Sequence, residues 1–326
     1  MTVSRRSFSA AALVLPVANT SLAQTAAAFP NRPVRLIVPF APGGSTDIVA
    51  RILAPGMQEA FNGRSVVAEN RAGAAGALGV EALVSSPPDG HAALIATLSN
   101  GVLAAGLMKN PRLDPRAAFL PVSLVATLPM VLTVGNQVPA QTLPEFIELM
   151  RAHPGETNYG SAGPGSLNHL GSYLLNMRTG TRSEHVPYRG SGPAFADLIA
   201  GHLQWLIEGI SAQAPFVTTG QVRALAVLSR ERSPLLPDVP TAVEQGVDFE
   251  IINFMGIFTV AGTPTALVSR LEAAIRSAVG NEATAKRLRE AGTDPVGSTS
   301  EEFKRFWEAQ LAQWLPVVAA SGVSVG

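Results

Sequence analysis

The stretch Val34 to Asp47, VRLIVPFAPGGSTD, predicts a strand, a tight turn and the start of a helix. Two glycines in the turn can adopt positive φ and let a ligand approach the backbone closely. The hydroxyl and acid residues after them are types that cap a helix, which we expect to begin near Ile48. The free N–H groups of such a helix start favour a carboxylate or phosphate. A purely structural strand-to-helix turn of an α/β protein would have the same pattern.

This strand, turn and helix unit recurs along the chain. The predicted strands are 66–68, 92–96, 157–162, 185–188 and 223–228, and the predicted helices are 77–84, 167–177 and 194–200. The turns at 73–76, 163–166 and 189–193 are rich in glycine. Strands that alternate with helices indicate a mostly parallel sheet with helices on both faces.

Two long apolar runs, 121–134 and 249–260, are typical of strands that cross between two lobes. We expect lobe 1 to be discontinuous, formed by 24–124 and 248–326 with amphipathic helices at 266–279, 282–291 and 301–319, and lobe 2 to span 125–247. Ligands of such folds bind outside the carboxyl ends of the strands. Glycine-rich turns from both lobes are therefore expected to face one cleft.

The composition indicates an exported protein and excludes several functions. Residues 1–23 have an arginine pair, a short apolar run and a Ser21-Leu22-Ala23 cleavage pattern, typical of an export signal and similar to a twin-arginine signal. Without Arg5 and Arg6 the 24 basic residues fall to 22 against 24 acidic ones, a net charge of −2 that recruits neither nucleic acid nor an anionic membrane. The chain has no cysteine, which excludes disulfides and thiolate chemistry.

Enzymatic patterns are weak. The turn after the first strand lacks the lysine of a nucleotide-binding loop, and the five histidines have no close metal-ligand spacing. A serine hydrolase built from Ser161 or Ser166 with His169 is the alternative, although no acid is placed to orient the imidazole. We expect His169 instead to be packed and hydrogen bonded at a helix start.

Four polar side chains each have two interpretations. Asp47 would repel an anion, so we expect it to cap its own helix. Tyr188 and Arg189 are predicted to contact ligand, although Arg189 could equally form an ion pair between lobes. Glu208 ends a strand pattern and is either a surface acid or a cleft residue. If Glu208 faces the cleft, it disfavours a simple dicarboxylate and favours a ligand with an amine or neutral distal end.

These residues together resemble the Bug-type periplasmic solute-binding proteins, the receptors of tripartite tricarboxylate transporters. The resemblance covers essentially the whole mature chain. The blocks that carry it, in order, are 29–40 FPNRPVRLIVPF, 42–47 PGGSTD, 69–74 ENRAGA, 88–90 PDG, 159–163 YGSAG, 185–190 HVPYRG, 223–227 RALAV and 236–241 LPDVPT.

The resemblance implies an α/β, two-lobed Venus-flytrap fold, with two doubly wound sheets joined by two crossing strands. It implies a small carboxylate as ligand, no cofactor and no catalysis, and the histidine spacing predicts no metal site. The implied partners are inner-membrane transporter subunits or, alternatively, a sensor protein, and we expect a periplasmic monomer. The segments around Asn100 and Glu208 depart from the commoner pattern of the family. The identity of the ligand therefore does not follow from the resemblance. Asn100 is expected to read the distal half of the ligand. The ligand-binding residues expected are Pro42, Gly43, Gly44, Ser45, Thr46, Asp47, Gly160, Ser161, Ala162, Gly163, Ser166, Tyr188, Arg189 and Glu208.

Overall fold

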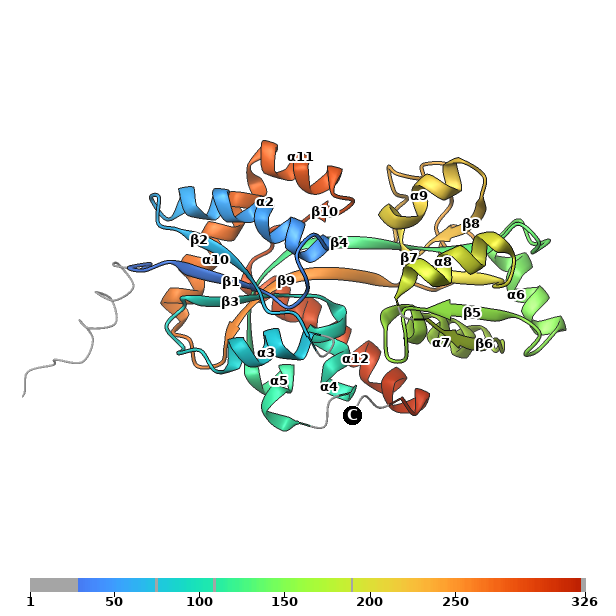
Figure 1. Cartoon of the computed structure of the whole chain (residues 1–326), viewed down its shortest axis with the longest axis horizontal. Coiled ribbons are helices and arrows are strands. Elements are labelled where there is room, and N and C mark those ends of the chain that lie inside the picture. The colour runs from blue at the N-terminus through green and yellow to red at the C-terminus, as the bar shows by residue number, and fades with distance from the viewer. Residues whose placement is uncertain (1–28, 74–75, 108–109, 189, 324–326) are drawn as a thin grey trace, which may run out of the picture.

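The computed structural model describes residues 29–73, 76–107, 110–188 and 190–323, and it forms two α/β lobes side by side (Figure 1). The predicted export signal at 1–23 lies outside the described residues. Two strands, β4 (Phe119–Gly135) and β9 (Ile252–Val260), run between the lobes (Figure 1). They correspond to the two apolar runs that the sequence marks as crossings.

Lobe 1 is built from the beginning and the end of the chain. Its strands are β1 (Val34–Val38), β2 (Val66–Asn70), β3 (Ala92–Ala96) and β10 (Asp294–Pro295). Its helices are α2 (Ser45–Ala60), α3 (Ala77–Val84), α4 (Ala104–Leu107), α5 (Pro115–Ala118), α10 (Thr265–Gly280), α11 (Glu282–Glu290) and α12 (Ser300–Ser321), with the π-helical segment η2 (Ser99–Leu103) and the 3-10 turn η3 (Pro111–Leu113).

Lobe 2 is formed by the middle of the chain. Its strands are β5 (Asn158–Ser161), β6 (Glu184–Pro187), β7 (Trp205–Gly209) and β8 (Val222–Val227). Its helices are α6 (Leu143–Ala152), α7 (Leu167–Thr179), α8 (Ser191–Ala200) and α9 (Ile210–Thr218).

The strands form one connected, mixed sheet in the order β2-β1-β3-β9-β4-β7-β5-β6, with β8 and β10 paired to β4. Pairing is parallel within each lobe, between β1 and its neighbours β2 and β3, and between β5 and its neighbours β6 and β7. The crossing strands pair antiparallel to each other and to β3, β7, β8 and β10. The expectation of a mostly parallel sheet is therefore wrong at the crossing, because strands that enter and leave lobe 2 side by side run in opposite directions.

Helix starts differ from the sequence expectation at two sites. Helix α2 begins at Ser45 rather than near Ile48, because Gly44 serves as its N-cap. Helix α8 begins at Ser191, since Pro193 fits the first turn, where a proline's missing N–H costs nothing. Helices α6 and α9 were not predicted from the sequence. Helix α9 contains Pro215, which masks its pattern.

Apolar burial on both faces of the sheet holds lobe 1 together. Helices α2 and α10 cover one face, where Gly56 allows a close approach: an added Cβ would lie 2.8 Å from the Cβ of Ala278. Helices α3 and α12 cover the other face, where the core continues into lobe 2 through Phe146 and Trp205. Within the described residues no helix is long and apolar enough to cross a membrane.

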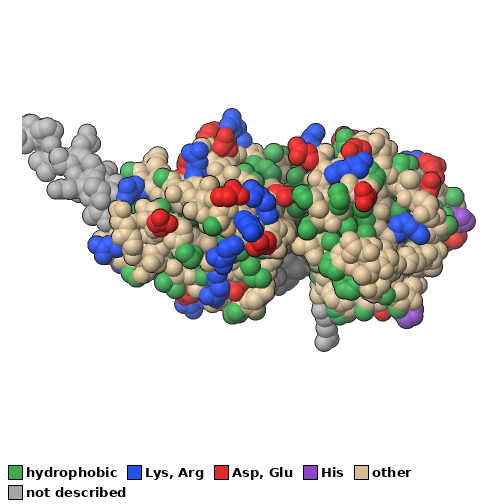
Figure 2. Space-filling view, turned by 90° about the horizontal axis from the view of Figure 1, so that it is seen from above, with side chains coloured by type: hydrophobic (Ala, Val, Ile, Leu, Met, Phe, Trp, Pro, Cys, Tyr) green, Lys and Arg blue, Asp and Glu red, His purple; other side chains and the backbone are tan. Residues whose placement is uncertain are grey.

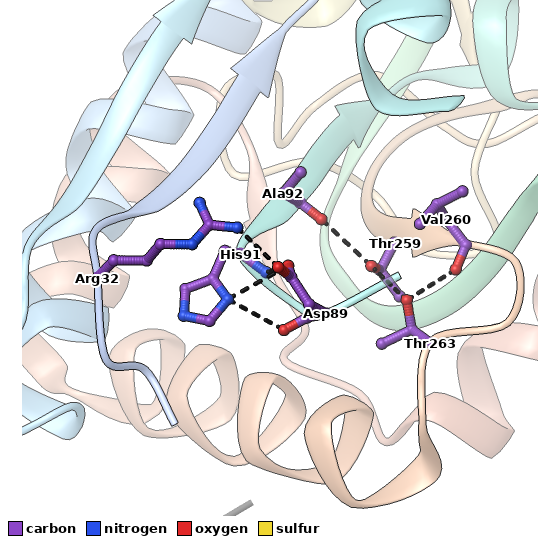
Figure 3. A network of polar contacts seen from close by, with 7 residues as sticks. All are labelled: Arg32, Asp89, His91, Ala92, Thr259, Val260 and Thr263. Atoms are coloured by element: carbon purple, nitrogen blue, oxygen red, sulfur yellow. Dashed lines mark hydrogen bonds and ion pairs between the residues drawn. The ribbon is translucent and has the colours of Figure 1, made fainter. Parts of the chain in front are cut away.

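A polar network lies at the end of the lobe 1 sheet where β3 begins and β9 ends (Figure 3). Arg32 forms an ion pair with Asp89 at 2.7 Å, and Asp89 also accepts the backbone N–H of His91. The hydroxyl of Thr259 on β9 donates to the carbonyl of Ala92 on β3 at 3.2 Å. The network joins the segment before β1 to β3 and β9. It lies at the end of the sheet where β1 and β3 begin, opposite their carboxyl ends. It is therefore structural and leaves those carboxyl ends free for a site.

Candidate functional site

The turn after β1 is held in place by Asp47, which is 3% exposed. One carboxylate oxygen accepts the backbone N–H of Gly43 at 2.9 Å and Nε of Arg51 at 3.0 Å. The other accepts Nδ2 of Asn70 at 2.9 Å. Asn70 also donates to the carbonyl of Phe40. The carboxylate thus binds the turn, its own helix and the end of β2 together.

These bonds keep Asp47 ionised. The hydrogen bond from Arg51 contributes most, and with those from Gly43 and Asn70 it outweighs burial and lowers the pKa of Asp47 to about 2. The expectation that Asp47 caps its own helix needs correction. The N-cap is Gly44, which has no side chain to bond, while Asp47 lies in the first turn and reaches back to Gly43. Because the N–H of Gly43 is already bonded, the donors of the turn that have no partner among the described residues lie further along, from Gly44 to Thr46.

The corresponding loop of lobe 2 follows β5 and is also self-bonded. Ser166 is the N-cap of α7: its hydroxyl donates to the carbonyl of Gly163 at 2.6 Å and accepts the N–H of His169. The N–H of Gly163 donates to Oγ of Ser161 at 3.1 Å. Gly163 adopts φ +126°, which an L side chain rarely adopts. These bonds fix the loop that presents Ala162 and the start of α7.

Two stacked histidines lie beneath this loop. The rings of His169 and His185 are 3.9 Å apart between centroids and nearly parallel. Nδ1 of His169 accepts the N–H of Gly165 at 3.1 Å, and Nε2 of His185 lies 2.6 Å from Oγ of Ser161. Burial, and secondarily His169, lowers the pKa of His185 to about 4, and burial lowers the pKa of His169. The expectation that His169 is packed and hydrogen bonded is confirmed, and both rings are neutral at neutral pH.

We expect the protein to lose stability as the pH falls from about 6.5 to about 4. The unfolded chain protonates His185 near pH 6.5, whereas the folded chain does so only near pH 4. Acid in this window therefore favours unfolding, by up to about 1.4 kcal/mol per pH unit for each such histidine. Urea unfolding across this range measures the slope.

His185→Gln should flatten that slope, because it removes one of the two groups that titrate on unfolding. The control is His153→Gln, since the side chain of His153 is half exposed on the surface of lobe 2. Equal slopes for His185→Gln and the unaltered protein would contradict the assignment.

Glycine N-caps are found at several of the helices that start after the parallel strands, although α7, which follows β5, has the side-chain cap Ser166. Four such helices begin at a glycine with no side-chain cap, namely Gly44 for α2, Gly76 for α3, Gly190 for α8 and Gly209 for α9. Other helices have capping side chains, namely Asp114 for α5, Thr142 for α6, Ser166 for α7, Asn281 for α11 and Thr299 for α12, whereas α10 begins after Pro264 with no side-chain cap. The first N–H groups of a helix have no partner within it. Uncapped starts in both lobes therefore offer donors to an anion.

The loops of lobe 2 approach lobe 1 directly. A Cβ on Gly165 would lie 3.2 Å from Cδ1 of Leu107, and one on Gly292 would lie 2.9 Å from Oγ of Ser211 in the first turn of α9. Figure 2 shows a hollow between the lobes, with basic and acidic side chains interspersed on the lobe 1 surface beside it. On the face shown in Figure 2, neither sign of charge dominates the lobe 1 surface beside this hollow.

Two further predicted site residues have partners in the structure. Glu208, at the end of β7, is half-buried and accepts Nδ2 of Asn168 at 2.8 Å and the N–H of Gly209 at 2.8 Å. No arginine, lysine or histidine of the described residues forms an ion pair with it. The hydroxyl of Tyr188 donates to Asp197 at 2.7 Å, and burial with this bond raises the pKa of Tyr188 to about 12. Arg189 lies outside the described residues.

Most of the predicted residues lie in two segments, 42–47 in lobe 1 and 160–166 in lobe 2, whereas Tyr188 and Glu208 lie elsewhere in lobe 2. Sequence reasoning missed Arg51 and Asn70, which hold Asp47, and His185, which contacts Ser161. A signal for Arg51 was present, since an acid and an arginine four positions apart on a helix face each other. Ser166 and His169 meet only through the backbone N–H of His169, not as a nucleophile and base.

Comparison with known proteins identifies the family. Residues 49–323 match the model of the tripartite tricarboxylate transporter family receptor. The chain belongs to this family. Protein BugT of Bordetella pertussis is 35% identical over 91% of this chain and 91% of its own length.

Two solved structures of similar proteins carry ligands. Rpa4515 of R. palustris with adipate has a TM-score of 0.76 and 32% identity, covering 91% of this chain and 99% of that one. MatC (Rpa3494) from Rhodopseudomonas palustris with bound malate has a TM-score of 0.73 and 32% identity, covering 89% of this chain and 100% of that one. These matches confirm the two-lobed flytrap fold that the resemblance implied.

Proposed function

We propose that this protein is an exported receptor that captures a small carboxylate between its lobes for a tripartite tricarboxylate-type transporter. The observation that carries the proposal is the pair of helix starts at the two loops, α2 after the N-cap Gly44 and α7 after the N-cap Ser166, because the first N–H groups of a helix have no partner within it and favour an anion. Membership of the receptor family and the adipate and malate bound by relatives support it.

The proposed ligand site joins loop 42–47 of lobe 1 to loop 160–166 of lobe 2. The N–H groups from Gly44 to Thr46 and the hydroxyl of Ser45 donate from lobe 1, while the N–H groups of Ala162 and of the start of α7 donate from lobe 2. Ligand contact with both lobes supplies the differential affinity that closure requires. We propose that lobe 1 spans 24–124 with 248–326 and that lobe 2 spans 125–247. We also propose that residues 1–23 export the protein to the periplasm, where it is a monomer. Its proposed partner is a set of transporter subunits or a sensor protein.

A hydrolase is not proposed, and we infer that the protein binds its ligand without chemical change. Ser161 is fully buried beside His185, so a substrate cannot reach its hydroxyl without moving the loop. Ser166 is committed to the cap of α7. Ester turnover that vanishes in Ser166→Ala would overturn this inference.

A thermal-shift panel tests the proposed function. The panel holds malate, adipate, succinate, lactate and glutamine, each at increasing concentration. A ligand at about 100 times its dissociation constant stabilises the folded state by roughly 2.7 kcal/mol. We expect at least one of these acids to raise the unfolding temperature. No shift with any of them would contradict a carboxylate receptor of this type.

We expect Glu208 to select against a second carboxylate. Its charge has no cationic partner among the described residues and lies at the carboxyl end of β7, where the cleft is proposed. Lactate or glutamine should therefore bind more tightly than succinate, and Glu208→Gln should improve succinate binding about tenfold, which is roughly 1.4 kcal/mol. The matched control is Glu156→Gln, an exposed acid of the same lobe. Micromolar succinate binding that Glu208→Gln leaves unchanged would contradict this role.

A further inference from the structure

Asn100 lies in the π-helical turn η2, which is separated from the end of β3 by two residues, and is 2% exposed. Its Oδ1 accepts the backbone N–H of Thr97 at 2.8 Å and lies 3.3 Å from the hydroxyl of Thr97. These donors fix which way the amide points, since the oxygen must face them. Nδ2, the donor end, is therefore held in one direction.

Nδ2 of Asn100 has no hydrogen-bond partner among the described residues, although it is buried. Leaving a buried donor unpaired costs about 1–3 kcal/mol, so such a group calls for a partner that arrives from outside. Single π-helical turns also concentrate at functional sites. The unpaired donor is thus a feature that packing alone does not explain.

Asn100 lies at the topological switch point of lobe 1. The chain leaves β1 for α2, which packs with α10 on one face of the sheet, and leaves β3 for η2, which packs with α12 on the other. Ligands of doubly wound sheets bind in the crevice where neighbouring strands send their connections to opposite faces. That crevice lies between the carboxyl ends of β1 and β3.

The groups around Nδ2 of Asn100 favour a ligand atom that accepts hydrogen bonds. A Cβ added to Gly76 would lie 3.1 Å from Nδ2 and 3.5 Å from Cβ of Pro39, so Nδ2 faces the N-cap of α3 and the residue after β1. Helix α3 spans eight residues and begins without a side-chain cap, which leaves its first N–H groups free of intrahelical bonds. A side-chain donor and helix donors converge here, and an oxygen acceptor satisfies both.

We propose that Asn100 is a specificity-determining residue whose Nδ2 donates to an acceptor oxygen of the ligand, other than the carboxylate held by the two loops, at the switch point between β1 and β3. The inference rests on the proposed function and adds a deep subsite in lobe 1, separate from the loop 42–47. It assigns this subsite to an acceptor oxygen and excludes an amine or another donor from it.

Asn100→Asp tests the proposal, because it keeps Oδ1 for Thr97 and replaces the donor with an acceptor. We expect calorimetry with malate, adipate, succinate, lactate and glutamine to show at least a 30-fold loss for each acid that the unaltered protein binds. Asn62→Asp is the control, since it adds the same charge to an exposed turn of lobe 1 at φ 54°, which aspartate tolerates. It should change binding less than twofold.

A crystal structure of the unaltered protein with the tightest of these acids provides a second measurement that needs no variant. Nδ2 within about 3.2 Å of a ligand oxygen supports the proposal. An ordered water as the sole partner of Nδ2, or an Asn100→Asp variant that binds within threefold of the unaltered protein, overturns it while leaving the receptor function intact. If the unaltered protein binds none of the five acids, the proposed function fails and this inference fails with it.

Discussion

Asp47→Ala should reduce carboxylate affinity at least 100-fold, a loss of about 2.7 kcal/mol. The carboxylate accepts bonds from Gly43, Arg51 and Asn70, so its removal frees the turn that presents the donors from Gly44 to Thr46. The free energy of unfolding should fall by about 2–4 kcal/mol, because charged hydrogen bonds are lost and buried donors are left without partners. Calorimetry with the tightest acid of the panel and urea unfolding measure the two effects.

Two further variants sharpen this prediction. Asp47→Asn keeps an oxygen for Gly43 and should lie between the unaltered protein and Asp47→Ala. Glu148→Ala removes an acid that pairs with Arg151 on an exposed helix surface and should cost less than about 0.5 kcal/mol. An Asp47→Ala variant that binds within threefold and unfolds like the unaltered protein would refute the anchoring role.

Gly256→Ala should destabilise the protein by about 3 kcal/mol, the upper part of the usual cost of overpacking. Gly256 lies on the crossing strand β9, and an added Cβ would fall 2.7 Å from Cε2 and 2.8 Å from Cε1 of Phe303. Phe303 is fully buried and packs against Phe258 at 4.8 Å between ring centroids, so it cannot swing aside. Thermal unfolding should show a fall of roughly 6–12 °C.

Gly280→Ala is the matched control for this substitution. Gly280 ends α10, and no heavy atom lies within 4 Å of a Cβ built there. Its unfolding temperature should stay close to that of the unaltered protein. Equal unfolding temperatures for the two variants would show that the contact between β9 and α12 is looser than the structure indicates.

Local patterns allowed the sequence to predict much of the fold. Strand β3 is a buried apolar run bounded by turn residues, and helix α3 follows a glycine turn, so both were predicted with the observed bounds. Register also decides contacts that no local pattern reveals. Val38 on β1 pairs with Asn70 on β2, which places Asn70 beside the turn that Asp47 holds.

Other features depend on long-range packing and could not be predicted. Ser161 meets His185 because β5 and β6 pair in parallel, with Tyr159 opposite His185. The start of α2 was misplaced because its N-cap is Gly44, which has no side chain to mark it. The antiparallel pairing of β4 with β9 follows from the return of the chain to lobe 1, a global property of the topology.

The central claim is that one carboxylate contacts loops of both lobes, and amide NMR during a titration tests it most directly. With the tightest acid of the panel, the account predicts that the N–H signals of Gly44 and Thr46 in lobe 1 and of Ala162 and Leu167 in lobe 2 shift with one common saturation curve. The signal of Ala312 on α12 should not move. Shifts confined to one lobe, or no shifts in either loop at saturating ligand, would contradict capture between the lobes.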